Sequence, residues 1–266
     1  MSTKHTKRVY NLLMIFKKST LLNAYSEIEH LFTTRDGGIS KSPFNSNNLA
    51  FHVGDKVNDV INNHTSLSKQ LNYKHTDLVH MRQIHSDIIT LVDPSIHNFD
   101  NPPECDALIT NLTNIPLMVM VADCTPVLFF DPVKKVIAVA HAGRAGAVMG
   151  IVPKSIQTMQ KEFGSKLENI HVVMGPSIGA CCYEVGEKIA NEVTAEGYGF
   201  AVVAKKGSYY LEVNAIIHHQ LQESGIKKEN IEDLDICNAC ENQTYFSYRA
   251  DKQKTGRIAG VIMLKH

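Results

Sequence analysis

Four short, almost continuously apolar runs in the middle of the chain constrain its fold more than any other feature. They span residues 117–122, 127–130, 136–140 and 170–174. Apolar runs of about four to eight residues with no polar alternation are typical of strands that are buried on both faces. The sequence therefore predicts a β-sheet that is covered on both sides.

Three other segments have the pattern of helices that could cover such a sheet: residues 152–163, 187–196 and 213–224. In the first, apolar residues recur at the spacing of one helix face, Pro153 lies in the first turn and Gly164 follows the last residue. Strands and helices alternate too irregularly for a doubly wound sheet. We therefore expect a mixed α/β (α+β) fold with one or more mixed β-sheets flanked by helices.

The chain contains no internal repeat and no linker that would divide it. The polar stretch 40–48 and the proline-containing stretch 93–104 are expected to be loops within one domain. We predict a single domain over residues 21–266. Residues 1–20 are predicted to be an extra N-terminal segment, either disordered or preceding the true start, with Met14 as an alternative first residue.

Charge and hydropathy narrow the classes of partner. Lysine plus arginine and aspartate plus glutamate both number 27, so the chain has no excess of positive charge for binding a nucleic-acid backbone. No apolar run approaches the roughly 18 residues of a membrane helix, and the run 12–16 is shorter than a secretory signal requires. We expect a cytoplasmic protein with a small-molecule partner, bound neither to nucleic acid nor to a membrane.

Polar and glycine residues follow three of the apolar runs directly. Cys124 follows the first run, His141 the third, and the glycine-rich segment 175–186 the fourth. Side chains at strand ends are held by the sheet while they remain open to a crevice, where α/β enzymes place their ligands. Three such ends predict one shared site.

Cysteine and histidine at these ends are ligands for zinc or copper. His85, which precedes the alternating segment 88–92, is a third candidate. Two histidines and one cysteine make a catalytic zinc set that leaves one position open for water or substrate. An isolated histidine or cysteine beside a buried strand is more often structural. The zinc site at this trio is therefore a hypothesis at this point.

Three other motifs have weaker functional interpretations. Residues 175–179 fit the G-x-S-x-G nucleophile elbow, but the only histidine after the candidate acids Asp233 and Asp235 is His266, so a glycine-rich anion loop is preferred. Residues 237–240 form a lone C-x-x-C, which we interpret as packing thiols because the other cysteine pair, 181–182, is adjacent rather than spaced. His218 and His219 point in different directions on a predicted helix and are expected at the surface.

Nine short motifs follow one another along the chain. They are 33–38 (TTRDGG), 51–55 (FHVGD), 83–85 (QIH), 105–110 (CDALIT), 122–126 (ADCTP), 141–143 (HAG), 175–186 (GPSIGACCYEVG), 245–249 (YFSYR) and 255–257 (TGR). From about Leu31 to the C-terminus, this series resembles the laccase-domain family, long labelled multicopper polyphenol oxidase and more recently described as purine nucleoside phosphorylase.

The resemblance implies a single mixed α/β domain with one zinc ion held by His85, Cys124 and His141, which would also be the catalytic residues. It implies phosphorolysis of adenosine, inosine and S-methyl-5′-thioadenosine, with adenosine deamination as a second activity. Purine nucleosides and phosphate are the expected partners, in a monomer or small homo-oligomer, and copper(II) is expected to bind in vitro because it outcompetes zinc for such ligands.

The chain departs from the family pattern after His141. The family often has H-A-G-W-R-G, whereas this chain lacks the tryptophan and has its arginine, Arg144, one position earlier. We name Arg144, Ser177 and Arg35 as candidate contacts for phosphate or the nucleoside.

Three alternatives remain open at this point. A copper-dependent polyphenol oxidase is disfavoured, because multicopper centres use H-x-H pairs and none of the 13 histidines forms one. A cysteine hydrolase would use Cys124 as nucleophile with His85 or His141 as base. A non-enzymatic zinc-binding protein would fill the fourth coordination position with a protein ligand.

Overall fold

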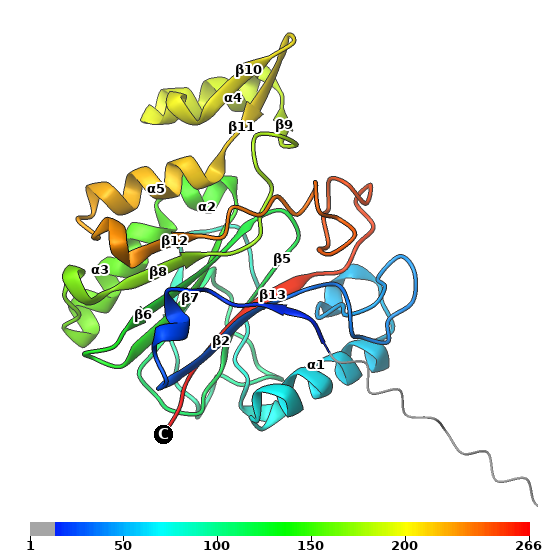
Figure 1. Ribbon diagram of the computed structural model, residues 1–266, viewed down its shortest axis with the longest axis vertical. Helices are drawn as coiled ribbons and strands as arrows, with labels where there is room; N and C mark the ends of the chain where they lie inside the picture. Colours follow the sequence, from blue (N-terminus) through cyan, green and yellow to red (C-terminus); the bar gives the residue numbers. More distant parts are fainter. Residues whose placement is uncertain (1–13) are drawn as a thin grey trace, which may run out of the picture.

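Two sheets form the centre of the molecule (Figure 1). The structure, a computed structural model, describes residues 14–266. The larger sheet has the order β12 (Ile231–Asp233), β8 (His171–Met174), β6 (Thr125–Asp131), β7 (Val136–Ala142), β4 (Ala107–Thr110) and β3 (Ile89–Leu91). It is mixed, because β12–β8 and β3–β4 are parallel and the other pairs antiparallel. The mixed α/β class is confirmed.

The second sheet is antiparallel throughout. Its order is β1 (Phe16–Lys17), β2 (Ile28–Thr33), β13 (Ile258–Leu264) and β5 (Leu117–Val121). The last strand of the chain thus lies between an early strand and a central one, with Gly260 opposite Phe32 on one side and Val119 on the other.

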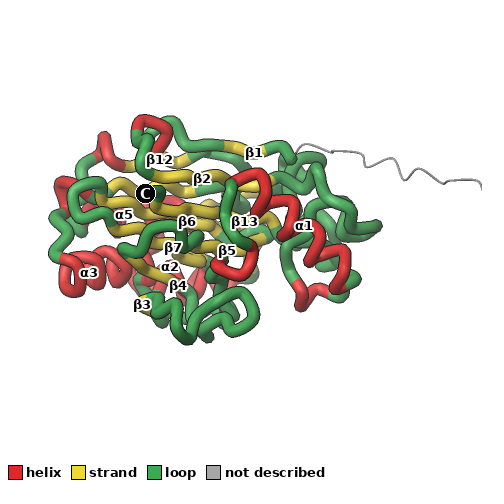
Figure 2. The backbone as a smooth tube through the Cα atoms, turned by 90° about the horizontal axis from the view of Figure 1, so that it is seen from below, coloured by secondary structure: helices red, strands yellow, loops and turns green. Residues whose placement is uncertain are grey.

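Helices cover the outer faces of both sheets, so that the strands lie between α3 and α1 (Figure 2). The helices α2 (Arg144–Val148), α3 (Ile151–Phe163) and α5 (Val213–Glu223) pack on the six-stranded sheet, and α1 (Val57–Leu71) packs beside the four-stranded sheet. Short 3-10 turns connect these elements at Leu22–Ala24, Phe51–Val53, His75–Asp77, Leu167–Asn169, Gly199–Ala201 and Lys228–Asn230.

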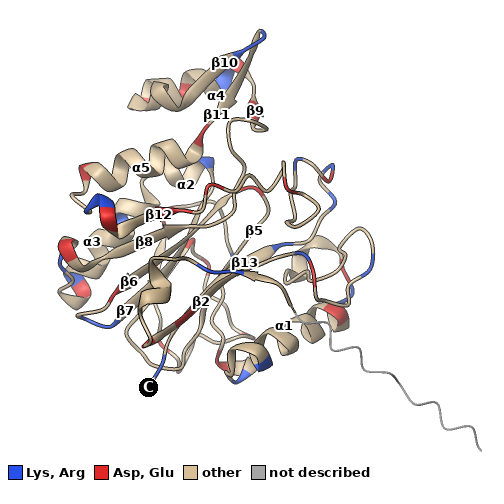
Figure 3. Ribbon diagram, viewed as in Figure 1, with Lys and Arg blue, Asp and Glu red and all other residues tan. Residues whose placement is uncertain are grey.

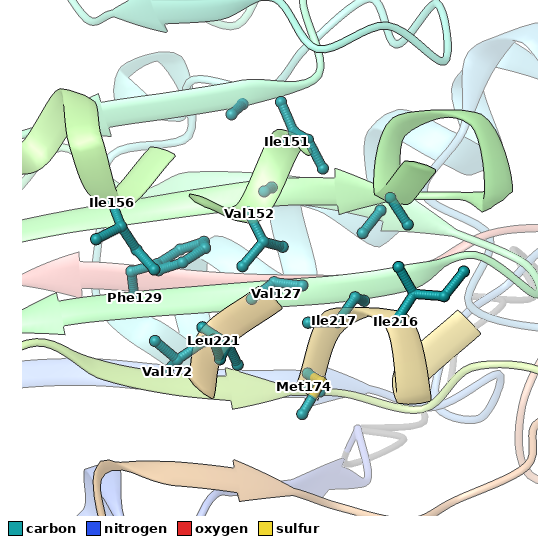
Figure 4. Close-up of a cluster of buried hydrophobic side chains, with 14 of the residues drawn as sticks. Val127, Phe129, Ile151, Val152, Ile156, Val172, Met174, Ile216, Ile217 and Leu221 are labelled. Atoms are coloured by element: carbon teal, nitrogen blue, oxygen red, sulfur yellow. The ribbon is translucent and has the colours of Figure 1, made fainter. Parts of the chain in front are cut away.

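The apolar side chains of β6 show why this strand reads as a continuous apolar run. Val127 and Phe129 face the helices α3 and α5 (Figure 4), whereas Leu128 and Phe130 face the space between the two sheets. Successive side chains of a strand point to opposite faces, so a strand in the middle layer needs apolar residues at every position. The covered sheet that the sequence predicts is therefore confirmed.

A small third sheet projects beyond the six-stranded sheet (Figure 1). It consists of β10 (Val202–Lys205), β11 (Ser208–Leu211) and β9 (Glu184–Val185), with α4 (Glu187–Val193) packed against β11. The helix predicted over 187–196 leaves α-geometry after Val193 and continues as a wider turn, Thr194–Tyr198, because Gly197 has a φ of 90° that a helix does not allow.

The other predicted elements agree with the structure within a few residues. The helices over 152–163 and 213–224 are α3 and α5, and the four apolar runs are β5, β6, β7 and β8. Within the predicted N-terminal segment 1–20, Phe16 in β1 pairs with Thr33 in β2, and the domain boundary at residue 21 stays a prediction. Residues 1–13 of the predicted N-terminal segment lie outside the described residues.

Acidic and basic residues are both distributed along the described chain (Figure 3). Blue and red segments are interspersed on the helices and loops, in keeping with the equal numbers of acidic and basic residues. Among residues 14–266, no helix combines the length and apolar character that crossing a bilayer requires.

Candidate metal centre

The structure brings together the three residues that the sequence predicted as a metal site. One ligand atom from each of His85, Cys124 and His141 lies within 4.8 Å of the others. The two imidazole rings are 4.8 Å apart between centroids and nearly perpendicular, at 77°. His141 is buried, Cys124 is half-buried and His85 is exposed, so the cluster opens to solvent on one side.

Cys124 lies at the corner where the chain passes from one sheet to the other. The preceding strand β5 belongs to the four-stranded sheet and the following strand β6 to the six-stranded sheet. Asp123 makes the turn with a φ of 94°, and its carboxylate accepts hydrogen bonds from the Ser247 hydroxyl at 2.7 Å and from the Arg249 backbone N–H at 2.7 Å. The thiol is thus fixed by two strands and by a loop from the C-terminal part of the chain.

A buried carboxylate orients both histidines. Asp106 Oδ1 lies 2.8 Å from His141 Nδ1, which leaves Nε2 as the nitrogen available to a metal. The same carboxylate accepts the backbone N–H groups of His85 at 3.1 Å and Ser86 at 2.6 Å, and the Ser86 hydroxyl at 2.7 Å. Asp106 has no solvent exposure, so all of these bonds form in a medium where their loss is costly.

A second anchor fixes the loop that carries His85. The Gln83 side chain donates to the Met120 carbonyl at 2.8 Å and accepts from the Met120 N–H at 3.0 Å. His85 itself has a φ of 60°, an unusual conformation for a non-glycine residue. Strained backbone that is held by several hydrogen bonds is frequent at functional sites.

The charges at the site favour a thiolate. Burial raises the pKa of Cys124, but the neighbouring His141 and His85 outweigh it and bring the pKa to about 6. Burial lowers the pKa of His141, but the Cys124 thiolate and Asp106 raise it to about 9. Burial raises the pKa of Asp106, and its bonds to His141 and Ser86 bring it down to about 2. Between pH 6 and 9, the metal-free site is therefore a thiolate–imidazolium pair.

These pKa values predict how fast Cys124 is alkylated. In metal-free protein, the iodoacetamide reaction of Cys124 should rise with pH through a midpoint near 6 and then level off, because only the thiolate reacts. Mass spectrometry of the alkylated peptides measures the rate of this reaction at each pH. His141→Ala should move the midpoint upward, and Cys105, whose pKa burial raises to about 11, should stay unreactive as an internal control. A Cys124 midpoint near 9 would contradict the ion pair.

Because Gly143 has no side chain, the Cys124 and His85 side chains can lie close to its backbone. A Cβ at this position would lie 2.8 Å from Cys124 Sγ and 3.3 Å from His85 Cδ2. We therefore expect Gly143→Ala to weaken metal binding about 10- to 100-fold, the range found when groups that orient metal ligands are changed. Competition with a chromophoric chelator measures the affinity.

Gly186 offers a matched control for this substitution. Both glycines precede a helix with nearly the same backbone, φ −74° at Gly143 and −73° at Gly186. A Cβ at Gly186 would meet nothing within 4 Å. If Gly186→Ala lowers the metal affinity as much as Gly143→Ala, the effect does not come from the close approach to the trio.

Arg249 lies beside the site on the C-terminal loop. Its guanidinium stands over the Tyr183 ring at 5.4 Å from the ring centroid and donates to the Glu184 carbonyl at 3.0 Å. Because its backbone N–H is bonded to Asp123, the residue next to Cys124, this arginine is held close to the trio.

Arg144 and Arg257 are two further cations near the trio. Arg144 follows Gly143 at the start of α2 and pairs with Glu192 at 3.8 Å. Its positive charge acts to lower the pKa of Tyr183, which burial raises. Burial lowers the pKa of Arg257, opposed by the charges of Cys124 and of the neighbouring Asp123, so this guanidinium is within electrostatic reach of the trio.

Arg35 and Ser177, the other two predicted substrate contacts, form hydrogen bonds to other residues of the protein. Arg35 donates to the Asn45 carbonyl at 3.1 Å and to the Asn242 carbonyl, and it lies 3.5 Å from Asp251. The Ser177 hydroxyl donates to Asn214 Oδ1 at 3.4 Å and lines a cavity of about 480 Å³. Contacts of Arg35 and Ser177 with substrate stay predictions.

Three backbone N–H groups of the predicted anion loop 175–179 are paired within the protein, and an anion contact of this loop stays a prediction. The backbone N–H groups of Gly175, Ser177 and Ile178 donate to the carbonyls of Pro126, Ile236 and Asp123 at 2.8 to 3.1 Å. These three N–H groups are therefore not available to a phosphate. His218, expected at the surface, also lines the 480 Å³ cavity, with Nε2 3.3 Å from Asp233.

Sequence reasoning missed several residues of this site, although the recurring motifs contain them. Asp106 is in CDALIT, Asp123 in ADCTP, Arg249 in YFSYR and Arg257 in TGR. The four-cysteine cluster described below was missed as well.

The fold and the site define a class of protein. It is a mixed α/β protein with an open candidate metal site of two histidines and one cysteine at the corner between two packed sheets. Residues 29–265 match the family described as multi-copper polyphenol oxidoreductase laccase, and the chain belongs to this family. A Corynebacterium glutamicum relative named purine nucleoside phosphorylase is 38% identical over 237 residues, which cover 89% of this chain and 94% of that protein. The Bacillus subtilis purine nucleoside phosphorylase YlmD is 32% identical over 243 residues, covering 88% and 87%.

Solved structures support the same relationship. The hypothetical protein YfiH from Bacillus licheniformis superposes with a TM-score of 0.88 at 32% identity, covering 97% of this chain and 98% of that one. YlmD from Geobacillus stearothermophilus superposes with a TM-score of 0.87 at 28% identity, covering 95% of this chain and all of the other.

Proposed function

We propose that this protein is a zinc-dependent purine nucleoside phosphorylase of the cytoplasm. Its substrates would be adenosine, inosine and S-methyl-5′-thioadenosine with inorganic phosphate, and adenosine deamination would be a second activity. The observation that supports the proposal most is the open trio of His85, Cys124 and His141 with three arginines around it. The names of its relatives agree with this chemistry.

The donor set fits zinc. Two imidazoles and one thiolate are ligands that zinc prefers, and three protein ligands leave the open position of a catalytic rather than a structural site. The bond from His141 Nδ1 to Asp106 is the outer contact typical of metal-binding histidines. When bound there, zinc would supply Lewis acidity toward an oxygen atom at the open position.

Phosphorolysis places two demands on the protein around this centre. A phosphate oxygen must form a bond to C1′ of the ribose while the bond from C1′ to the purine nitrogen breaks, and the departing purine must take up a proton. The phosphate dianion needs cationic partners, and Arg144, Arg249 and Arg257 are available close to the trio. We assign these arginines to holding and orienting the phosphate.

The family's description as a copper oxidase fits the residues less well. A multicopper oxidase needs several copper centres, and hence many clustered histidines. Within the described residues, two groups of side chains could hold a metal ion. The trio contains two histidines, and the other group consists of cysteines. Copper bound at the trio would account for weak oxidation of phenols as a side reaction.

A cysteine hydrolase is a second candidate, because Asp106, His141 and Cys124 have the arrangement of a catalytic triad. The carboxylate bonds His141 Nδ1 at 2.8 Å, and the imidazole adjoins a thiol whose pKa it lowers. A triad, however, gives no role to His85, whose ring also faces the cluster. Bound metal would occupy the thiolate that a hydrolase needs.

Product analysis tests the proposal. Protein purified with its native metal is incubated with adenosine, with and without phosphate, and the products are separated chromatographically. We expect adenine and ribose 1-phosphate only when phosphate is present, and inosine without phosphate as the second activity. Cleavage of esters or amides with no turnover of adenosine would instead support the hydrolase.

Arg144 gives a sharper test of the phosphate contact. We expect Arg144→Ala to raise the KM for phosphate about 10- to 100-fold, because a hydrogen bond to a charged group contributes about 1.5–3 kcal/mol. The KM for adenosine should change much less. Arg82→Ala is the control, since Arg82 is exposed and forms its salt bridge with Glu104, at 3.7 Å. An unchanged KM for phosphate would remove Arg144 from this role.

A further inference from the structure

Four cysteines form a second cluster that shares no residue with the trio. The Sγ atoms of Cys181, Cys182, Cys237 and Cys240 all lie within 4.8 Å of one another. Cys240 Sγ is 3.5 Å from that of Cys181 and 3.3 Å from that of Cys182. All four are free thiols, half-buried or exposed.

The backbone brings the two cysteine pairs together. Cys181 and Cys182 lie in the loop between β8 and β9, and Cys237 and Cys240 lie in the loop after β12, which pairs with β8 (Figure 1). A bridge between Ser177 and Cys237 extends this pairing, with hydrogen bonds of 3.1 and 3.0 Å on either side. The thiols therefore meet because of the sheet and its connections.

Turns on both sides point the thiols toward one centre. Residues 180–182 form a turn in which the Cys182 N–H bonds the Gly179 carbonyl at 3.0 Å. Residues 238–240 form another, in which the Glu241 N–H bonds the Cys237 carbonyl at 2.9 Å. In a turn, even adjacent cysteines can face one point, which the alternation of a strand would prevent.

The spacing of the sulfurs fits a single ion. In a tetrahedral four-thiolate zinc site with Zn–S bonds of about 2.3 Å, the sulfurs lie about 3.8 Å apart. The Sγ–Sγ separations of 3.3 and 3.5 Å, and the 4.8 Å limit on all pairs, are close to this value. In an iron–sulfur cluster the cysteines bind different iron atoms, so their sulfurs would be spread more widely.

We propose that Cys181, Cys182, Cys237 and Cys240 together bind one zinc ion through four thiolates. Unlike the trio, this site has a complete set of protein ligands, which is typical of structural zinc. The ion would join the loop that continues to Tyr183 with the loop that continues to Arg249, and these two side chains already stack at 5.4 Å beside the trio. The second zinc would thus stabilise the loops that carry the phosphate-binding side of the site.

Metal content and cobalt spectra test this inference. We expect full-length protein purified under reducing conditions to hold two zinc ions per chain, and Cys237→Ser/Cys240→Ser to hold one. In cobalt-loaded protein, the sulfur-to-cobalt charge-transfer band grows with the number of thiolate ligands. Cys124→Ser, which removes the one thiolate of the trio, should keep most of the band, and Cys237→Ser/Cys240→Ser should lose most of it.

The cobalt spectrum of Cys124→Ser decides the question even if the double variant does not fold, because that variant leaves all four cluster cysteines in place. Cys105→Ala is the control for loss of a thiol outside both clusters. The inference is overturned if the band disappears in Cys124→Ser, or if a soluble double variant holds as much metal as the wild type. It is also overturned if intact mass shows a disulfide among these cysteines in protein freshly purified under reducing conditions.

Discussion

Cys124→Ala is expected to abolish the proposed phosphorylase activity and the proposed metal binding at the trio. The substitution removes the only thiolate of the set and leaves two imidazoles, of which one is exposed. We expect kcat/KM for phosphorolysis to fall about 10³- to 10⁴-fold, which corresponds to roughly 4–6 kcal/mol of lost transition-state stabilisation. Steady-state kinetics together with metal analysis of the same preparation measures both effects.

Cys105→Ala is the matched control for this variant. Cys105 is buried with no exposure and lies outside both clusters, so its loss removes a thiol without changing a ligand. This variant should lose some stability and keep its metal and activity. If Cys124→Ala retains phosphorolysis within about tenfold of the wild type, a difference of only about 1.4 kcal/mol in the barrier, Cys124 does not hold the catalytic metal.

Asp106→Asn is expected to have the second largest effect. An amide has one acceptor in place of two, and its NH₂ group would face N–H and O–H donors from residues 84–86 and from His141. We expect the metal affinity to fall about 10- to 100-fold and the free energy of unfolding to fall by about 3 kcal/mol. Chelator competition and denaturant unfolding measure the two quantities.

Asp131 separates the two effects. It is equally buried, and it lies at the other end of β6, where its carboxylate accepts the N–H groups of Val133 at 2.9 Å and Lys134 at 3.0 Å. Asp131→Ala, which removes the acceptor of both N–H groups, should lower the stability and leave the metal affinity unchanged. Equal loss of metal in both variants would mean that Asp106 acts through general stability and not by orienting the histidines.

The central strands could be predicted from the sequence because burial on both faces leaves a clear mark. In β6 and β7, no position faces water, so the apolar run is continuous. The same mark says nothing of partners, and the assignment of β5 and β6 to different sheets depends on the turn at Asp123. The pairing of β2 with β13 joins residues from opposite ends of the chain, which periodicity cannot show.

The helix α1 was not predicted, for a physical reason. Its buried face combines Val60 and Leu67 with Asn63, His64 and Ser68, so its apolar stripe is interrupted. The Asn63 side chain donates to the Asn48 carbonyl at 2.8 Å and accepts from the Ile39 N–H at 2.9 Å. Polar residues that hold the loop 39–48 thus take the place of the apolar ones that mark a helix.

The trio could be predicted because strand ends and ligand chemistry agreed, but its supporting residues could not. Asp106 reads as one acidic residue before a strand, and only the folded chain shows that it contacts both histidines. For the same reason, the sequence did not show that the four cysteines form one cluster. Two adjacent cysteines and a C-x-x-C have no spacing in common, and the pairing of β8 with β12 is what brings them together.

Anomalous diffraction at the zinc edge, from crystals of protein purified with its native metal, tests the central claim most directly. We predict a peak about 2.0–2.1 Å from one nitrogen each of His85 and His141 and about 2.3 Å from Cys124 Sγ, with a fourth ligand that is not a protein side chain. A map with no peak between these three residues, or with a fourth protein ligand closing the site, would contradict a catalytic metal at this position.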